Sequence, residues 1–268
     1  MDHPLLSVII PVYNAQEFLS IALDSVFSQD IKDMEIILVN DGSKDDSLSL
    51  CRQYAAKDER IVVIDQQNAG PGAARNAALK VAKGRYLSFV DSDDSLQPGA
   101  YRSMLSAIQK NEACMVIAHF NILMKNQIFD RGYIKQDTYL DREAFFHALA
   151  YRPGSYYYSA LWNKLYKRQI IQENHLSFNP TLSWGEDFEF NMAYYRHIQK
   201  VCFVSEPVYN YRRTYSGQTW RTMFELHSSF RIKSELYKRL KSLYQHAGLF
   251  EKYRLYIYRY IFNITIST

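Results

Sequence analysis

The chain has 268 residues, 47% of them hydrophobic, so it can bury a substantial core in one large or two small domains. Its net charge of +4 is unevenly spread: residues 1–110 carry 11 Lys and Arg against 15 Asp and Glu, and the remainder carries 21 against 13. A basic second half favours an anionic partner or surface, and it does not choose among nucleic acid, phospholipid and a phosphorylated substrate.

The three cysteines, Cys51, Cys114 and Cys202, are widely spaced and form no CxxC pair. This pattern argues against a disulfide framework and a structural zinc site, and it predicts a reducing compartment. The first apolar run has no basic region before it, and no stretch reaches the roughly 18 apolar residues of a membrane span. We therefore expect a cytoplasmic protein, with peripheral attachment to the inner face of the cytoplasmic membrane left open.

The first 120 residues alternate between continuous apolar runs, typical of buried strands, and apolar residues at helical spacing. Asn14, with Glu17 three residues later, is placed to cap the first helix. Strands that alternate with helices predict an α/β fold with a mostly parallel central sheet and helices on both faces, which binds ligands at the carboxyl ends of the strands. Strands are predicted over 5–12, 35–39, 60–65, 85–90 and 113–120, and helices over 18–27, 45–56, 71–82 and 98–110.

Beyond residue 120 the alternation is weaker. The spacing predicts helices over 141–150, 163–174 and 186–196 and a strand over 201–204. Residues 221–268 contain 9 Lys and Arg against 3 Asp and Glu, and they are typical of one or two basic, aromatic amphipathic helices. We predict a main domain over 1–220, with halves at 1–110 and 111–220, and a helical extension over 221–268.

Three carboxylates, Asp91, Asp93 and Asp94, directly follow the fourth predicted strand. Like charges this close raise one another's pKa unless a cation neutralises them. The D-x-D spacing suits Mg²⁺ or Mn²⁺, which bind few protein carboxylates and complete their shell with substrate phosphates. An acidic turn that caps the next helix explains the spacing equally well. Of the three, Asp94 is expected to be structural.

Two other polar residues lie where a ligand site is expected. Asp41 follows the second strand, where an acidic side chain commonly binds ribose hydroxyls or a base N–H; the alternative is an Asx turn with Gly42. Arg75 is a single charge among the small residues of the third helix. It could reach a diphosphate or sugar, or it could pair with a neighbouring aspartate.

A second acidic site, Glu186 and Asp187, follows Trp184 and Gly185. Neighbouring aromatic residues could partly desolvate a carboxylate there and make it a usable general base. Taken alone, the pair fits better as the acidic first turn of a helix, stabilised by the helix dipole.

The first turn carries Pro-Val-Tyr-Asn, so both the G-x-G-x-x-G dinucleotide fingerprint and the P-loop are missing from the chain. Taken in order, the motifs that are present resemble family two of the glycosyltransferases, the inverting enzymes with the GT-A fold. They are SVIIPVYN at 7–14, VNDGS at 39–43, NxGxxxARN at 68–76, DSDD at 91–94, WNKLY at 162–166 and GEDxxF at 185–190.

The resemblance implies that the sheet binds a nucleoside-diphosphate sugar, most often a UDP-sugar, and that the sugar passes with inversion to a hydroxyl of a saccharide or lipid-linked acceptor. It implies Asp187 as the catalytic base with Glu186 as its helper, and Asp93 as the ligand of Mn²⁺ or Mg²⁺. The histidine that some relatives use as a metal ligand has no obvious counterpart. The nucleotide-binding residues that it implies are Pro11, Tyr13, Asp41, Asn68, Arg75, Asp91 and Ser92.

Four residues are expected nearer the diphosphate and the acceptor. Trp162 and Lys164 are placed to line the acceptor side, although Trp162 also fits as a core residue. Arg212 and Ser216 resemble a later polar loop of the family that can close over the diphosphate.

Two other functions are weighed against a transferase that builds a bacterial polysaccharide or lipid-linked glycan. A nucleotidyltransferase would need a Gly-rich basic loop after the first strand, and a non-catalytic nucleotide-sugar-binding relative would have lost the base or the metal pair. Nucleic acid is not expected as a partner. The basic aromatic extension fits a peripheral membrane contact, packing on the main domain, or a homo-oligomer contact.

Overall fold

The computed structural model describes residues 4–124, 127–182, 185–213 and 226–266, without the side chains of 226–233, 236 and 260–266. Trp184, Ser216 and the predicted domain boundary at residue 220 therefore lie outside the described residues.

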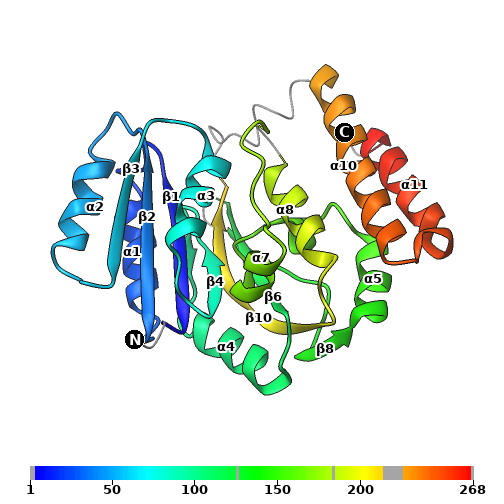
Figure 1. The fold of residues 1–268 in the computed structure, drawn as a ribbon, viewed down its shortest axis with the longest axis horizontal. Coiled ribbons are helices and arrows are strands. Elements are labelled where there is room, and N and C mark those ends of the chain that lie inside the picture. The colour runs from blue at the N-terminus through cyan, green and yellow to red at the C-terminus, as the bar shows by residue number, and fades with distance from the viewer. Residues whose placement is uncertain (1–3, 125–126, 183–184, 214–225, 267–268) are drawn as a thin grey trace.

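The first half of the chain forms a parallel sheet with connecting helices, as its alternating pattern predicts (Figure 1). The strand order is β3-β2-β1-β4, and all three neighbouring pairs are parallel. Val8, Ile9 and Ile10 are fully buried, as expected for a strand that is covered on both faces. The elements are β1 (Leu6–Val12), α1 (Leu19–Phe27), β2 (Met34–Asp41), α2 (Ser47–Ala55), β3 (Ile61–Gln66), α3 (Pro71–Val81) and β4 (Tyr86–Phe89).

The second half extends the same sheet in mixed orientation. Strand β9 lies antiparallel between β4 and β6, whereas β6 and β10 are parallel. The strands are β5 (Ser95–Leu96), β6 (Met115–Met124), β7 (Gln127–Arg131), β8 (Thr138–Asp141), β9 (Lys164–Lys167) and β10 (Lys200–Arg212). The helices are α4 (Ala100–Asn111), α5 (Arg142–Tyr151), α6 (Tyr156–Ser159), α7 (Arg168–Glu173) and α8 (Glu186–Tyr195).

The structure corrects three local predictions. The helix expected over 163–174 is strand β9 followed by α7, because this segment pairs with β4 and β6. The short strand expected at 201–204 is part of β10, which spans thirteen residues. Asn14 does not cap α1: it has a φ of 48°, and its side chain accepts a hydrogen bond from the Lys44 N–H.

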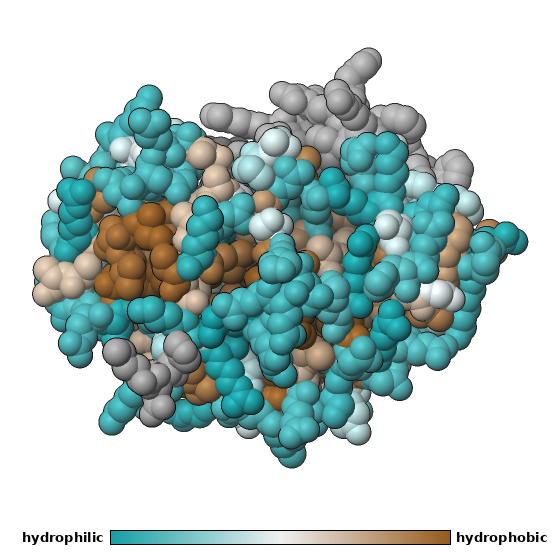
Figure 2. Space-filling view, viewed as in Figure 1, coloured by the Kyte–Doolittle hydropathy of each residue, from teal (hydrophilic) through white to brown (hydrophobic). Residues whose placement is uncertain are grey.

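Helices α10 (Leu226–His246) and α11 (Phe250–Ile266) form a hairpin that packs on α8 and α5 (Figure 1). The Tyr244 hydroxyl donates to the Phe146 carbonyl, 2.7 Å away, and Arg239 pairs with Glu189. No helix in the described part of the chain is long and apolar enough to cross a membrane. On the face shown in Figure 2, apolar surface gathers over the β2–β3 edge of the sheet, where Val62 is 41% exposed.

Candidate active site

Arg75 joins three carboxylates from two distant segments of the chain. Its guanidinium lies 3.0 Å from the Asp91 carboxylate, after β4, and 3.1 Å from both Glu186 and Asp187, at the start of α8. Arg75 is 4% exposed, so the cation is buried, whereas the side chains of its three partners are 12–32% exposed. The arrangement brings the two acidic sites of the sequence together around one cation, and we call Arg75 and its three partners the Arg75 cluster.

The local sequence explains how Arg75 reaches this position. Gly70 has a φ of 89° and Pro71 occupies the first turn, so α3 begins abruptly after the β3 loop. The small residues Ala74 and Ala78 are fully buried, which lets the helix lie close to the sheet. The Phe178 ring packs against the guanidinium, 5.6 Å from its carbon, and shields its far side.

The start of α8 sets the position and the proton affinity of Asp187. Gly185 adopts a left-handed conformation with a φ of 83°, which turns the chain so that Glu186 and Asp187 lie in the first helical turn. Burial raises the pKa of Asp187 to about 7; Arg75 opposes this rise, and the neighbouring carboxylates of Glu186 and Asp91 add to it. A carboxylate with a pKa near neutrality is suited to take up a proton during a reaction.

The acidic loop after β4 is held by β10. The Asp91 N–H donates to the Tyr209 hydroxyl, 3.0 Å away, and Asp94 accepts from the Arg212 N–H at 2.7 Å. Asp94 is 2% exposed, so the expectation that it is structural is in keeping with its position. Tyr209 is a contact that the sequence analysis missed, since a single tyrosine among 22 gives no signal of such a role.

Asp93 differs from its two neighbours because it is exposed at the surface of the loop. Crowding by surrounding protein atoms and repulsion from Asp91 together raise its pKa to about 6. Arg212 contacts the same residue through the backbone, where its Nε donates to the Asp93 carbonyl at 3.2 Å. The Asp93 carboxylate is thus accessible to a ligand from solvent.

At the end of β2, the structure gives Asp41 a role that the sequence did not predict. Its carboxylate accepts from the Gln66 side chain at 2.8 Å and from the N–H groups of Ala69 and Gly70 at 2.9 Å. It is 3% exposed, and it fixes the loop between β3 and α3, whereas the predicted alternative was a turn with Gly42. Asp41 therefore shapes the loop that carries Asn68.

The other predicted nucleotide-binding residues lie at the carboxyl ends of the strands. Tyr13 is 48% exposed after β1, and Asn68 is exposed after β3, so both side chains are accessible to a ligand. Pro11 lies in β1 opposite Val39, and Ser92 is half-buried in the acidic loop.

The structure does not place Trp162 and Lys164 on an open surface. Trp162 is 5% exposed and stacks on Tyr209 and Tyr211, with ring centres 4.6 and 5.5 Å apart, so it is a core residue. Lys164 is fully buried, and its ammonium donates to the carbonyls of Tyr157 and Ala160. Neither side chain lines an acceptor groove in this conformation, in contrast to the sequence-based expectation.

Comparison with known proteins decides the family. The family model described as glycosyl transferase family 2 matches residues 7–174. This chain belongs to that family. Glycosyltransferase EpsH of Bacillus subtilis is 31% identical over 265 residues, which cover 95% of this chain and 73% of EpsH. Poly(ribitol-phosphate) beta-glucosyltransferase of Bacillus spizizenii is 32% identical over 213 residues, 77% of this chain and 32% of that protein.

Solved structures confirm the GT-A fold. The S. aureus protein TarS in complex with UDP-GlcNAc superposes with a TM-score of 0.73 at 21% identity, over 90% of this chain. The match covers 66% of the TarS fragment, so this chain spans slightly less than two thirds of it. A mannosyltransferase from Pyrobaculum calidifontis, in complex with GDP-Man and Mn²⁺, has a TM-score of 0.60 at 15% identity, over 89% of this chain and 64% of that one.

Family 2 members often use a divalent metal, and the residues of this chain fit one only with help from a substrate. Within the described residues there is no group of three His, Cys, Asp or Glu side chains that could hold an ion. Asp93 is the accessible carboxylate of the acidic loop, since Asp91 is paired with Arg75 and Asp94 is buried. One carboxylate together with donor phosphates and water is a donor set that suits Mg²⁺ or Mn²⁺.

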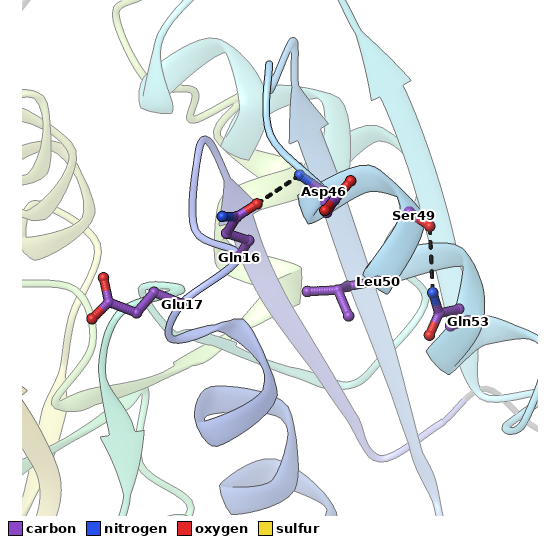
Figure 3. Close-up of a pocket in the computed structure, with 6 residues that line it drawn as sticks. All are labelled: Gln16, Glu17, Asp46, Ser49, Leu50 and Gln53. Atoms are coloured by element: carbon purple, nitrogen blue, oxygen red, sulfur yellow. Dashed lines mark hydrogen bonds between the residues drawn. The ribbon is translucent and has the colours of Figure 1, made fainter.

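A pocket elsewhere on the glycosyltransferase does not belong to this site. Six side chains line it between the start of α1 and helix α2: Gln16, Glu17, Asp46, Ser49, Leu50 and Gln53 (Figure 3). None of them belongs to the Arg75 cluster. The pocket is therefore separate from Arg75 and its three carboxylate partners.

Proposed function

We propose that this family 2 enzyme is an inverting glycosyltransferase that moves a sugar from a UDP-sugar to a hydroxyl of a saccharide or lipid-linked acceptor, with Asp187 as its base. The observation that carries the proposal is the Arg75 cluster. It links Asp91, in the acidic loop after β4, to Asp187, whose pKa is raised to about 7. An inverting transfer needs a proton acceptor on one side of the sugar and charge stabilisation on the other, and the cluster supplies residues for both.

In this mechanism the acceptor hydroxyl approaches Asp187, which takes its proton as the oxygen attacks the anomeric carbon. The bond from that carbon to the nucleoside diphosphate breaks in the same displacement, so the configuration inverts. Arg75 holds Asp187 in place through its 3.1 Å ion pair, and Glu186 shares the same guanidinium. When bound, a divalent metal at Asp93 would neutralise charge on the leaving diphosphate.

On the donor side, we assign the base and ribose to Tyr13, Asn68, Pro11 and the loop that Asp41 fixes. Tyr13 and Asn68 are the exposed members of this group, at the ends of β1 and β3, where nucleotides bind in α/β sheets. Ser92 and Arg212 lie beside Asp93 and are assigned to the diphosphate. A UDP-sugar donor is supported by the similarity to TarS, which was crystallised with UDP-GlcNAc.

A donor panel tests this proposal. The protein is incubated with Mn²⁺, a set of UDP-, GDP- and dTDP-sugars and simple saccharide acceptors, and release of the nucleoside diphosphate is measured. We expect release from at least one UDP-sugar. A nucleotidyltransferase would instead release pyrophosphate from a nucleoside triphosphate, and a binding protein would bind a UDP-sugar without turnover; either result would overturn the assignment.

We also propose that the outer face of α11 contacts an anionic membrane, where a lipid-linked acceptor would be found. Tyr253 and Ile257 of α11 are buried against the rest of the protein. Leu255 is 74% exposed, and Arg254 and Arg259 are also exposed on this helix. This mixture suits an interfacial helix. Sedimentation with vesicles of anionic lipid is expected to fall when both arginines are changed to Glu. Lys57→Glu, at an exposed position just after α2, is the control. Equal vesicle binding by wild type, the double arginine variant and Lys57→Glu would refute the contact.

A further inference from the structure

Lys164 is a fully buried lysine at the start of β9. Its Nζ donates to three oxygens: the carbonyls of Tyr157 at 3.0 Å and Ala160 at 2.5 Å, and the side-chain oxygen of Asn163 at 2.8 Å. All three acceptors are neutral, and within the described residues no carboxylate forms an ion pair with this lysine. A buried cation without a bonded counter-ion is costly, which raises the question of its function.

The geometry indicates that Lys164 carries its charge. A neutral amine has two N–H groups and a lone pair, so one of the three close oxygens would face that lone pair. An ammonium has three N–H groups and satisfies all three oxygens. The site is therefore built for the charged form, although burial lowers the pKa of Lys164 well below its ordinary value.

Hydrogen bonds connect this buried charge to the start of α8. The Ala160 carbonyl that binds Lys164 also lies 3.2 Å from the Asn191 side-chain nitrogen, which donates more closely to the Ser159 carbonyl at 2.7 Å. The same Asn191 nitrogen donates to the Asp187 carbonyl at 3.0 Å, and the Asn191 oxygen accepts from the Tyr166 hydroxyl at 2.8 Å. The Ala160 carbonyl and the Asn191 side chain thus link Lys164 to the backbone of Asp187, the residue proposed as the base.

We propose that Lys164 is an electrostatic positioning residue for Asp187, a second positive charge that acts from inside the protein, in addition to Arg75, to keep the base ionised. The inference rests on the proposed function, in which Asp187 accepts the proton. This role explains why the protein keeps a lysine that does not reach the surface.

The charged and titratable groups that face Asp187 come from four elements. Arg75 on α3 and Lys164 on β9 favour its ionised form, whereas Glu186 on α8 and Asp91 after β4 oppose it. Tyr166 on β9 is buried, and the nearby Asp187 charge helps to raise its pKa well above the ordinary range. In turn, the Asp187 carboxylate raises the pKa of Lys164 against the effect of burial, so the two charges support each other.

The test compares pH profiles of kcat/KM for wild type and Lys164→Gln. Gln keeps a polar, hydrogen-bonding side chain and removes the charge. The acid limb of the profile is expected to move up by about one pH unit, because Asp187 loses a favourable charge in a low-dielectric site. Lys80→Gln, which removes an exposed lysine from α3, is the matched control and should leave the limb unchanged.

Asn163→Asp provides an independent variant of nearly the same shape, which also gives up the hydrogen bonds from the Asn163 amide to the Ala118 and Tyr157 carbonyls. It places a carboxylate against the Lys164 ammonium, 2.8 Å from the present oxygen, and offsets the charge without removing it. The acid limb should again move to higher pH. UDP binding and melting temperature are measured for both variants to confirm that they are folded.

The outcomes separate this inference from the proposed function. If wild type turns over no donor, the proposed function fails. If wild type is active and the acid limb is unmoved in both folded variants, the positioning role of Lys164 is wrong while the function stands. If both variants lose UDP binding and their cooperative melting, Lys164 serves the fold alone, and the inference is likewise overturned.

Discussion

Arg75 on α3 and Asp187 on α8 are 112 positions apart in the sequence, and their side chains meet at 3.1 Å, with the arginine buried and the aspartate partly exposed. This pair couples the half of the sheet proposed to bind the nucleotide to the half proposed to bind the acceptor. Because Asp91 and Glu186 share the same guanidinium, Arg75 determines the charge balance of the whole cluster.

Replacing Arg75 with Ala should destabilise the protein and abolish transfer. The change leaves three carboxylates facing one another without a cation, and breaking a buried ion pair by removing one partner typically costs about 3–5 kcal/mol. Urea denaturation measures the free energy of unfolding. Arg52→Ala, which breaks an exposed pair with Asp65, is the control and should cost less than about 1 kcal/mol. Equal losses in the two variants would contradict the central position of Arg75.

Asp187→Asn should make the protein more stable at pH 8 than wild type. Burial raises the pKa of Asp187 from 3.8 to about 7, so between these values the folded state binds more protons than the unfolded state. Stability contributed by this group is therefore present at low pH and is lost as pH rises through about 7. The side chain still contacts solvent, so we expect a gain on the order of 1 kcal/mol. Melting temperatures at pH 5 and pH 8 measure it, and a gain that is no larger at pH 8 would contradict the raised pKa.

Tyr209→Phe should weaken donor binding while leaving the fold intact. The Tyr209 hydroxyl accepts a hydrogen bond from the Asp91 N–H at 3.0 Å. Removing the hydroxyl leaves this N–H of the acidic loop without its partner. We expect a cost of about 1–2 kcal/mol, seen as a raised KM for the donor. Tyr244→Phe is the control, since its hydroxyl donates to the Phe146 carbonyl far from the cluster. A donor KM that rises equally in both variants would show that Tyr209 has no special relation to the loop.

Alanine substitutions at two glycines distinguish the cost of backbone strain from the cost of a steric clash. Gly42 and Gly99 have φ values of 68° and 77°, so an alanine is strained at either position. A Cβ at Gly42 would lie 2.7 Å from the Asn68 nitrogen, whereas one at Gly99 meets no atom within 4 Å. Gly99→Ala should cost about 1 kcal/mol, and Gly42→Ala should cost more and weaken UDP binding. If calorimetry gives equal losses of stability and of UDP affinity, the close approach of the two loops is not functional.

The sequence predicts the first half of the fold well because continuous apolar runs and helical spacing leave little choice there. Since parallel strands end at one edge, the sequence also predicts that Asp41 and Asp91 lie in the same region. It does not predict β9: the segment from Lys164 to Asn174 is rich in helix-forming residues, and pairing with β4 and β6 overrides that local preference.

The sequence is also a poor guide to which polar residues are buried. Lys164 lies in a motif that resembles an acceptor site, and only the surrounding carbonyl groups, which come from the backbone, show that it is an internal cation. In the same way, Asp41 holds a loop through two N–H groups that carry no sequence signal.

In the proposed mechanism, Asp187 takes the proton of the acceptor hydroxyl. The most direct measurement is kcat for transfer by Asp187→Asn, together with the UDP dissociation constant of the same variant and of the control Asp65→Asn. We expect Asp187→Asn to lose at least about a hundredfold in kcat while both variants bind UDP as wild type does. Transfer by Asp187→Asn at the wild-type rate would show that another group is the base.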